Sequence, residues 1–344
     1  MKRFSELCLR RFVSRTLGGW QPFSALLWLL TGSILESAVI TEDFATNPLN
    51  HKWRVFGDSN LFSFNQGSQS LSVTWDSSCS NSYYYLPLDN ILCRNDDFSV
   101  ALDLELSNFK TGVNPAKPST FELAFGFMNI LDAVKTNFYR GNAALVQNLV
   151  EFDFFPESDF APTIWPSIWS TNSTLNYNGP GDYTIRSLPT GIVMRVVMSY
   201  TASNQTLSTS ITTNGISIGV INRVPLSSSF GDFRVNAFAF ESYTDLGQDP
   251  RYGGSLLAHG GVDNVTLTVP SPPVQDLGII LSNNQCQVSF TSRPHWFYVV
   301  ERSSDLQTWS GVSTVLPGNG QKILWLDTNA PPAVAFYRIR SERL

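Results

Sequence analysis

Two carboxylates stand inside an apolar, aromatic run of this sequence. Residues 148–160 read NLVEFDFFPESDF, with Glu151 and Asp153 two positions apart and Glu157 and Asp159 behind them. If the run is a β-strand, Glu151 and Asp153 share one face and lie about 7 Å apart along it. Carboxylates at that spacing suit an acid/base pair, a metal site or a clamp for sugar hydroxyls.

The other face of the same strand is wholly apolar. Val150, Phe152 and Phe154 alternate with the two acids and predict one wall of a hydrophobic core. The carboxylates are therefore expected to point away from that core, toward a concave and partly aromatic surface. A structural alternative stays open, in which hydrogen bonds and a counter-charge from Arg140 or Arg195 hold the pair.

Two tryptophans follow in FAPTIWPSIW, residues 160–169. Trp165 and Trp169 are four positions apart across a proline, which indicates a loop or a short extended segment. Aromatic faces with a few polar groups nearby are typical of ligand sites, sugar sites included. Glu151, Asp153, Trp165 and Trp169 form the predicted ligand-binding set. The alternative is that both indole rings cover the edge of the core.

Short strand-like runs fill residues 39–270. They lie at 70–75, 98–106, 121–128, 148–155, 192–200, 205–212, 233–242 and 262–269. Clusters of Gly, Asn, Pro and Ser separate them, and Asn214-Gly215 predicts a tight hairpin, because this pair tolerates positive φ. No helical period is sustained, so the sequence predicts an all-β sandwich or jelly roll.

Pro270-Ser271-Pro272-Pro273 marks a predicted domain boundary. Residues 271–344 are expected to form a Pro-rich linker and a small immunoglobulin-like or fibronectin-like β-sandwich. The segments FYVVERSSDLQTWS and AFYRIR resemble accessory modules of secreted bacterial proteins. That resemblance implies spacing, docking or anchoring rather than catalysis.

Residues 1–38 have the organisation of a signal peptide. Five basic side chains precede the apolar run FSALLWLL at 23–30, and small residues near Ser33 and Ala38 mark two cleavage positions. A membrane anchor is the alternative, although the run is shorter than the ~20 residues of a spanning helix. The mature chain is therefore predicted to lack a membrane span and to be exported, to the periplasm, the cell surface or the medium.

The charge and the cysteine content of the chain limit its possible partners and sites further. Residues 1–38 carry five basic and two acidic side chains, so their removal changes the formal net charge from −5 to −8. No basic run remains, which argues against nucleic acid as a partner. In an oxidising compartment Cys79 and Cys93 could close a loop worth ~3 kcal/mol, or remain free thiols. The three histidines are far apart in the sequence and predict no zinc site.

The acid-bearing strand resembles a known family. Val150-Glu151-Phe152-Asp153 is similar to the VEFD core of legume-type (L-type) lectins, and Leu123-Ala124-Phe125 is similar to their GLAF segment. Residues 199–211 and 235–245 resemble two later strands, so the resemblance covers most of 39–270. It implies a concanavalin A-like jelly roll of two antiparallel sheets.

The resemblance also implies a metal, and calcium is the candidate cofactor. In those lectins the Glu and Asp of VEFD bind a transition metal and calcium, which here implies Glu151 and Asp153 as ligands, with Asp159 as a substitute. The family's sugar-binding Asp would fall at Phe121, which cannot bind a hydroxyl group. A later asparagine ligand is replaced by Glu157. The fold is therefore expected without the family's complete site.

Enzymes that hydrolyse β-glucans share this fold and carry Glu-x-Asp-x-Glu or Glu-x-Asp-x-x-Glu. This chain has Glu151-x-Asp153-x-x-x-Glu157, which is longer. A retaining hydrolase needs carboxyl groups ~5–5.5 Å apart, whereas six strand residues span ~20 Å.

Three functions follow as hypotheses. The leading one is an exported, lectin-like protein that binds polysaccharide or glycan without catalysis. The second is a divergent polysaccharide hydrolase or lyase that uses Glu151, Asp153 and Glu157. The third is a structural or adhesion protein of the cell surface.

Overall fold

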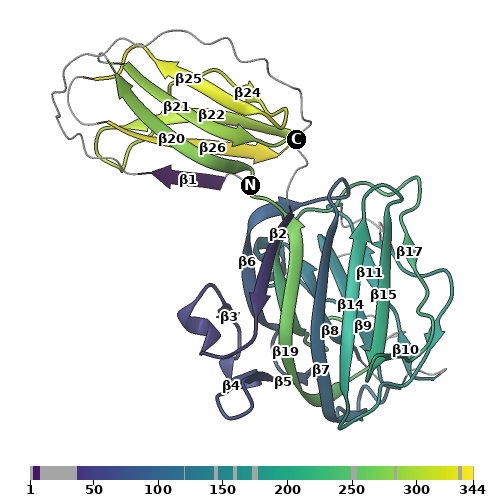
Figure 1. Ribbon diagram of the computed structural model, residues 1–344. Coiled ribbons are helices and arrows are strands. Elements are labelled where there is room, and N and C mark those ends of the chain that lie inside the picture. Colours follow the sequence, from purple (N-terminus) through teal and green to yellow (C-terminus); the bar gives the residue numbers. More distant parts are fainter. Residues whose placement is uncertain are drawn as a thin grey trace. The chain divides into compact units, whose positions relative to one another are not determined.

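The computed structural model describes residues 37–119, 121–142, 146–157, 161–172, 177–248, 254–282, 285–331 and 335–343, together with the backbone of 3–7. The chain divides into two compact units, one of residues 37–270 and one that contains residues 271–344 and the N-terminal segment. Almost all regular structure is β (Figure 1), which confirms the predicted fold class. In the described part of the chain, no helix has the length and apolar character to cross a membrane.

Two antiparallel sheets of nine strands each build residues 37–270 (Figure 1). The first, here called the front sheet, has the order β12 (Tyr177–Asn178), β11 (Ser167–Trp169), β9 (Leu149–Phe155), β8 (Leu123–Met128), β18 (Val235–Ser242), β6 (Ser82–Leu92) and β3 (Arg54–Phe56). β10 (Thr163–Ile164) pairs with β9, and β13 (Thr184–Ile185) pairs with β10.

The second, the back sheet, has the order β16 (Ile216–Ser217), β15 (Thr206–Thr213), β14 (Val193–Thr201), β7 (Phe98–Thr111), β19 (Leu256–Pro270), β5 (Ser70–Asp76) and β4 (Phe62–Asn65). β17 (Val224–Pro225) pairs with β15, and β2 (Ser37–Glu42) pairs with β19. The helical segments are η1 (Pro48–Asn50), η2 (Ser59–Leu61) and α1 (Ile130–Ala133). The Asn214-Gly215 turn joins β15 to β16, and both residues have the positive φ that the sequence predicted.

The chain alternates between the sheets, as predicted for a concanavalin A-like jelly roll. β5 lies in the back sheet, β6 in the front, β7 in the back, β8 and β9 in the front, and β18 and β19 repeat the exchange. Inward side chains fill the space between the sheets. Phe98 of β7 meets Phe127 of β8 edge to face, with ring centroids 4.9 Å apart. The Trp75 indole N–H donates to the Ala124 carbonyl across the core at 3.1 Å.

The central strands of the front sheet are buried on both faces. In β8 and β18 every residue is buried, and in β9 every residue except Phe155 is buried. The back sheet covers one face. Burial of the second face explains why these strands read as nearly continuous apolar runs rather than as an alternation.

The structure does not join Cys79 to Cys93 in a disulfide, so of the two alternatives that the sequence left open it has the two thiols. The reason is the length of β6, which occupies the eleven residues Ser82–Leu92 between them. A strand rises ~3.3 Å per residue, so β6 holds the two cysteines at opposite ends. A disulfide requires Cα atoms closer than about 7 Å.

The C-terminal unit contains two smaller sheets. One has the order β1 (Arg3–Leu7), β26 (Phe336–Arg343), β22 (Trp296–Ser303) and β23 (Ser310–Gly311), with β24 (Leu316–Pro317) also on β22. The other has the order β20 (Val274–Ser282), β21 (Gln285–Ser292) and β25 (Lys322–Asp327). The immunoglobulin-like or fibronectin-like assignment stays a prediction. β1 falls within the predicted signal peptide, whose apolar run at 23–30 lies outside the described residues.

Candidate functional site

The strand around the two acids is β9, and its two faces differ as the sequence indicates. Phe152 stacks on Phe125 of β8 in the core between the sheets, with ring centroids 4.8 Å apart. Glu151 and Asp153 lie on the opposite, outer face of the front sheet, where the Ser167 hydroxyl donates to Asp153 at 2.8 Å. Both acids are fully buried. The prediction of an open concave surface around these acids is therefore wrong, because described residues cover them.

A single guanidinium binds both acids. Nη2 of Arg140 donates to Oδ2 of Asp153 at 3.0 Å, and Nε donates to Oε1 of Glu151. Nη2 also donates to the Ser167 hydroxyl at 3.2 Å. The guanidinium carbon lies 4.7 Å from the centre of the Trp169 ring, so a cation–π contact adds to the ion pairs. Of the two arginines considered from the sequence, this one supplies the counter-charge.

Arg195 lies elsewhere. It pairs with Asp103 of β7 in the back sheet at 3.2 Å, and both side chains are partly exposed. This exposed pair gives a useful contrast with the buried one, because solvent screens it.

The arginine reaches the front sheet because residues 129–142, here called the strap, are tied to its outer face. The Tyr83 hydroxyl of β6 donates to the Ala133 carbonyl at 3.1 Å. The Asn81 amide donates to the Phe138 carbonyl at 2.7 Å. The strap is therefore fixed to the β6 side by neutral hydrogen bonds and to the β9 side by the arginine.

Two further carboxyl groups complete the cluster. Oε1 of Glu122 lies 3.4 Å from Nε of Arg140, and Glu241 of β18 is fully buried beside them. The Tyr243 hydroxyl donates to Oε2 of Glu151 at 2.9 Å. The Glu241 side chain interacts with the carboxyl group of Glu151 and with the Tyr243 hydroxyl. Three carboxyl groups thus surround the guanidinium, and Glu241 joins them through Glu151. The four acids and Arg140 are here called the acid cluster.

Burial raises the pKa of carboxyl groups in the acid cluster and so favours their protonated form. Desolvation raises the pKa of Glu122 to about 7, against the opposing effect of Arg140. Desolvation, reinforced by the charge of Glu151, raises the pKa of Asp153 and of Glu241 well above the ordinary carboxyl range. Charged groups are costly in a low-dielectric interior. The cluster therefore carries fewer negative charges than its four acids would carry in water.

This geometry does not present an acid/base pair to a substrate. A glycosidase needs two carboxyl groups that the glycosidic bond can reach, whereas Glu151 and Asp153 are sealed under the strap. Glu157, the third predicted catalytic residue, is exposed after the end of β9 and accepts a hydrogen bond from the Thr111 hydroxyl at 2.9 Å. It does not join the acid cluster. Asp159 lies outside the described residues.

The predicted calcium site fits the described residues poorly. Calcium needs six to eight oxygen ligands, but Arg140, Tyr243 and Ser167 already occupy oxygens of Glu151 and Asp153. Within the described ranges, no group of three or more His, Cys, Asp or Glu side chains is arranged to hold a metal ion. The guanidinium of Arg140 stands where the resemblance placed a cation and supplies the positive charge that calcium would supply.

The two predicted tryptophans have different surroundings. Trp169 is 6% exposed and stacks on Tyr177, with centroids 4.8 Å apart and planes 20° apart. Trp165 is half-buried and packs against Tyr183 with centroids 4.6 Å apart. Tyr177 and Tyr183 are 44% and 55% exposed. The tryptophans thus support tyrosines that are open to solvent, and these four rings form the aromatic rim.

Sequence reasoning missed Tyr177, Tyr183, Glu122 and Glu241. The two glutamates carried a usable signal, because each is a lone acid in an apolar run, FELAF and FAFES. A charge in such a run needs a buried partner. The tyrosines stand in polar, Gly- and Asn-rich sequence, where no periodic pattern marks them.

Comparison with known proteins finds distant structural similarity. No protein-family model and no curated protein matches the chain. Peanut lectin with a nonamer peptide is 15% identical over 69% of this chain and 99% of its own, with a TM-score of 0.40. Lectin UEA-II complexed with galactose is 12% identical over 68% and 99%, with a TM-score of 0.42. Alginate lyase Aly36B is 13% identical over 62% and 86%, with a TM-score of 0.35. Similarity at this level carries no information on ligand or activity.

Proposed function

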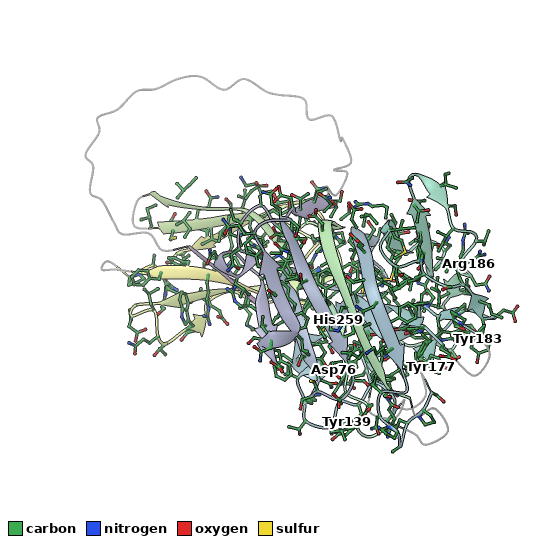
Figure 2. All side chains as sticks on the ribbon, turned by 90° about the horizontal axis from the view of Figure 1, so that it is seen from below. Asp76, Tyr139, Tyr177, Tyr183, Arg186 and His259 are labelled. Atoms are coloured by element: carbon green, nitrogen blue, oxygen red, sulfur yellow. The ribbon has the colours of Figure 1, made fainter. Side chains whose placement is uncertain are left out.

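We propose that this protein binds polysaccharide or glycan without catalysis, through the aromatic rim. The observation that carries the proposal is the pairing of each exposed tyrosine with a less exposed tryptophan (Figure 2 labels both tyrosines). Sugar rings have apolar faces that stack on aromatic side chains. Their hydroxyl groups accept and donate hydrogen bonds at the edges of the ring.

The rim is built to be rigid. Trp165 packs so closely on Gly179 that an added Cβ there would lie 2.6 Å from its indole nitrogen. Trp169 is held between Tyr177 and Arg140. A ring that is already fixed loses little conformational entropy when a ligand binds. Tyr177 and Tyr183 therefore present preformed surfaces.

The absence of catalysis is part of the proposal and rests on burial. Glu151, Asp153 and Glu241 are fully buried, so a polymer lying on the rim would not touch them. Prolonged incubation with a polysaccharide that binds should release no reducing ends and no unsaturated sugars. Product formation that Glu151→Gln abolishes would instead support the hydrolase or lyase hypothesis.

The binding test compares two double variants. Tyr177→Ala/Tyr183→Ala should weaken retention in affinity electrophoresis through a polysaccharide panel by about tenfold or more, a change of about 1.4 kcal/mol or more. Ile216→Ala/Val220→Ala is the matched control, because these side chains are 72% and 84% exposed and lie outside the rim. Equal retention of both variants, with circular dichroism showing intact sheets, would refute the proposal.

Export is proposed on the basic n-region and apolar run of residues 1–38. Intact-mass analysis of the protein recovered outside the cytoplasm should show a chain that begins between residues 34 and 39. Recovery of a chain that retains residues 3–7, which pair with β26, would contradict cleavage.

A cell-surface scaffold is the second candidate function. The sealed acid cluster favours it, because those acids bind only their neighbours in the described structure. Under this hypothesis no glycan in the panel would retain the wild-type protein.

A further inference from the structure

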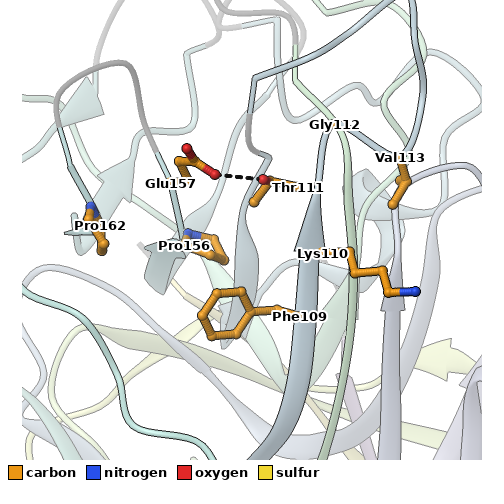
Figure 3. A pocket seen from close by; sticks show the side chains of 8 residues that line it. All are labelled: Phe109, Lys110, Thr111, Gly112, Val113, Pro156, Glu157 and Pro162. Atoms are coloured by element: carbon orange, nitrogen blue, oxygen red, sulfur yellow. Dashed lines mark hydrogen bonds between the residues drawn. The ribbon is translucent and has the colours of Figure 1, made fainter.

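A pocket of about 690 Å³ lies at one end of the two sheets of residues 37–270 (Figure 3). Its lining residues come from the end of β7 and the segments next to β9 and β10: Phe109, Lys110, Thr111, Gly112, Val113, Pro156, Glu157 and Pro162. The volume is within the range of small-molecule sites, ~300–1,000 Å³. It lies apart from the acid cluster, which is buried.

The walls of the pocket are fixed by the backbone. Gly112 has φ +60°, and a Cβ there would lie 2.5 Å from the Pro118 carbonyl oxygen. Pro156 and Pro162 have φ restricted by their rings. Phe109 contacts Phe154 of β9 edge to face, with centroids 6.2 Å apart. The aromatic floor is therefore held by contacts with both sheets.

The lining of the pocket includes one carboxylate, Glu157, and one ammonium group, Lys110. The Thr111 hydroxyl donates to Oε2 of Glu157 at 2.9 Å, which orients this carboxylate over the pocket. The Lys110 side chain runs away from Glu157 (Figure 3). The whole chain has a formal net charge of −5, so its field favours cations.

We propose that this pocket binds a sugar residue that carries a protonated primary amine, as in a deacetylated amino-sugar polymer. The inference rests on the proposed function and names the class of its ligand. The ammonium group pairs with the Glu157 carboxylate, and the apolar face of the sugar lies on Phe109 and Pro156. An ammonium group near an aromatic face gains a cation–π contact as well. A sugar hydroxyl meets Thr111.

The test uses four glycosides that share a pyranose ring and differ in charge or in one substituent. Methyl glucosaminide, methyl glucoside, methyl N-acetylglucosaminide and methyl glucuronide are titrated into the full chain and followed by ligand-observed NMR. The glucosaminide should bind about tenfold more tightly than the two neutral glycosides, because a charge-assisted contact is stronger than a neutral one. Glu157→Gln should remove that advantage, and Glu105→Gln, at an exposed carboxylate outside the pocket, should leave it unchanged.

Controls separate this site from the rim. Tyr177→Ala/Tyr183→Ala should keep glucosaminide binding while losing the polymer, so failure of the rim and failure of the pocket give different results. Equal affinity for all four glycosides would overturn the proposal, as would tightest binding of the glucuronide. Butylamine binding as tightly as the glucosaminide would overturn the sugar part of it.

Discussion

The acid cluster and the aromatic rim lie next to each other on the front sheet, yet they differ in every physical respect. The cluster is charged and sealed, whereas the rim is apolar and open at Tyr177 and Tyr183. Trp169 belongs to both, since it contacts Arg140 and Tyr177. The types of the acidic residues suggested a functional site, whereas their burial indicates a role in stability, and the proposed ligand contact lies at the exposed rim.

The largest expected effect is on stability, from Arg140→Gln. Loss of the guanidinium leaves buried carboxylates without a counter-charge, which costs about 3–5 kcal/mol. Urea denaturation followed by tryptophan fluorescence measures it. Arg195→Gln is the control, because its pair with Asp103 is partly exposed and is worth about 0–1 kcal/mol. Similar losses of unfolding free energy in the two variants would contradict the claim that the buried ion pairs of Arg140 stabilise the protein more than the partly exposed pair of Arg195.

The pH dependence of stability comes next. The folded state raises the pKa of Glu122 to about 7, and raises those of Asp153 and Glu241 further above their usual range. The folded protein therefore binds more protons than the unfolded chain near neutrality. Its stability is complete at acidic pH and falls as pH rises through about 7, by about 1.4 kcal/mol per pH unit for each proton.

Glu122→Gln should reduce the slope of this profile below pH 7 and leave the contributions of Asp153 and Glu241. Glu105→Gln, at an exposed site, should not change it. Urea midpoints measured between about pH 5 and pH 9 provide the check, because this window brackets the raised pKa. A profile that rises with pH would mean that the cluster is ionised in the folded state.

A smaller loss is expected from Gly126→Ala, at the floor of the acid cluster. The new methyl group would lie 2.4 Å from the Val150 carbonyl oxygen and 2.6 Å from Cα of Glu151. Overpacking of this kind costs about 1–3 kcal/mol. Gly261→Ala is the matched control on the back sheet, where no heavy atom lies within 4 Å of an added Cβ. Thermal unfolding of both variants would show whether the covered face is as tightly packed as the contacts indicate.

The smallest effect on stability belongs to the rim. Tyr183→Ser changes an exposed ring, so the free energy of unfolding should change by less than about 0.5 kcal/mol. Glycan retention should fall in the same protein. A variant that loses stability and keeps binding would reverse the roles assigned to cluster and rim.

The sequence predicted the strands well because their patterns are local. Each of the eight predicted strands overlaps an observed one, from β5 to β19, and the apolar face of β9 was predicted from alternation alone. Burial of the acids was not predictable in the same way. It depends on the strap, which folds back over the front sheet and brings Arg140 to residues eleven and thirteen positions further on. No period in the sequence encodes such a return.

The position of Trp169 makes this residue a possible fluorescence probe. Its ring lies within contact distance of a charge on one side and of a partly exposed phenol on the other. Indole emission responds to both kinds of neighbour, so this residue is a built-in optical reporter at the boundary between interior and surface. A ligand that displaces Tyr177 would change the emission spectrum of Trp169. Loss of a proton from the acid cluster would change it through Arg140.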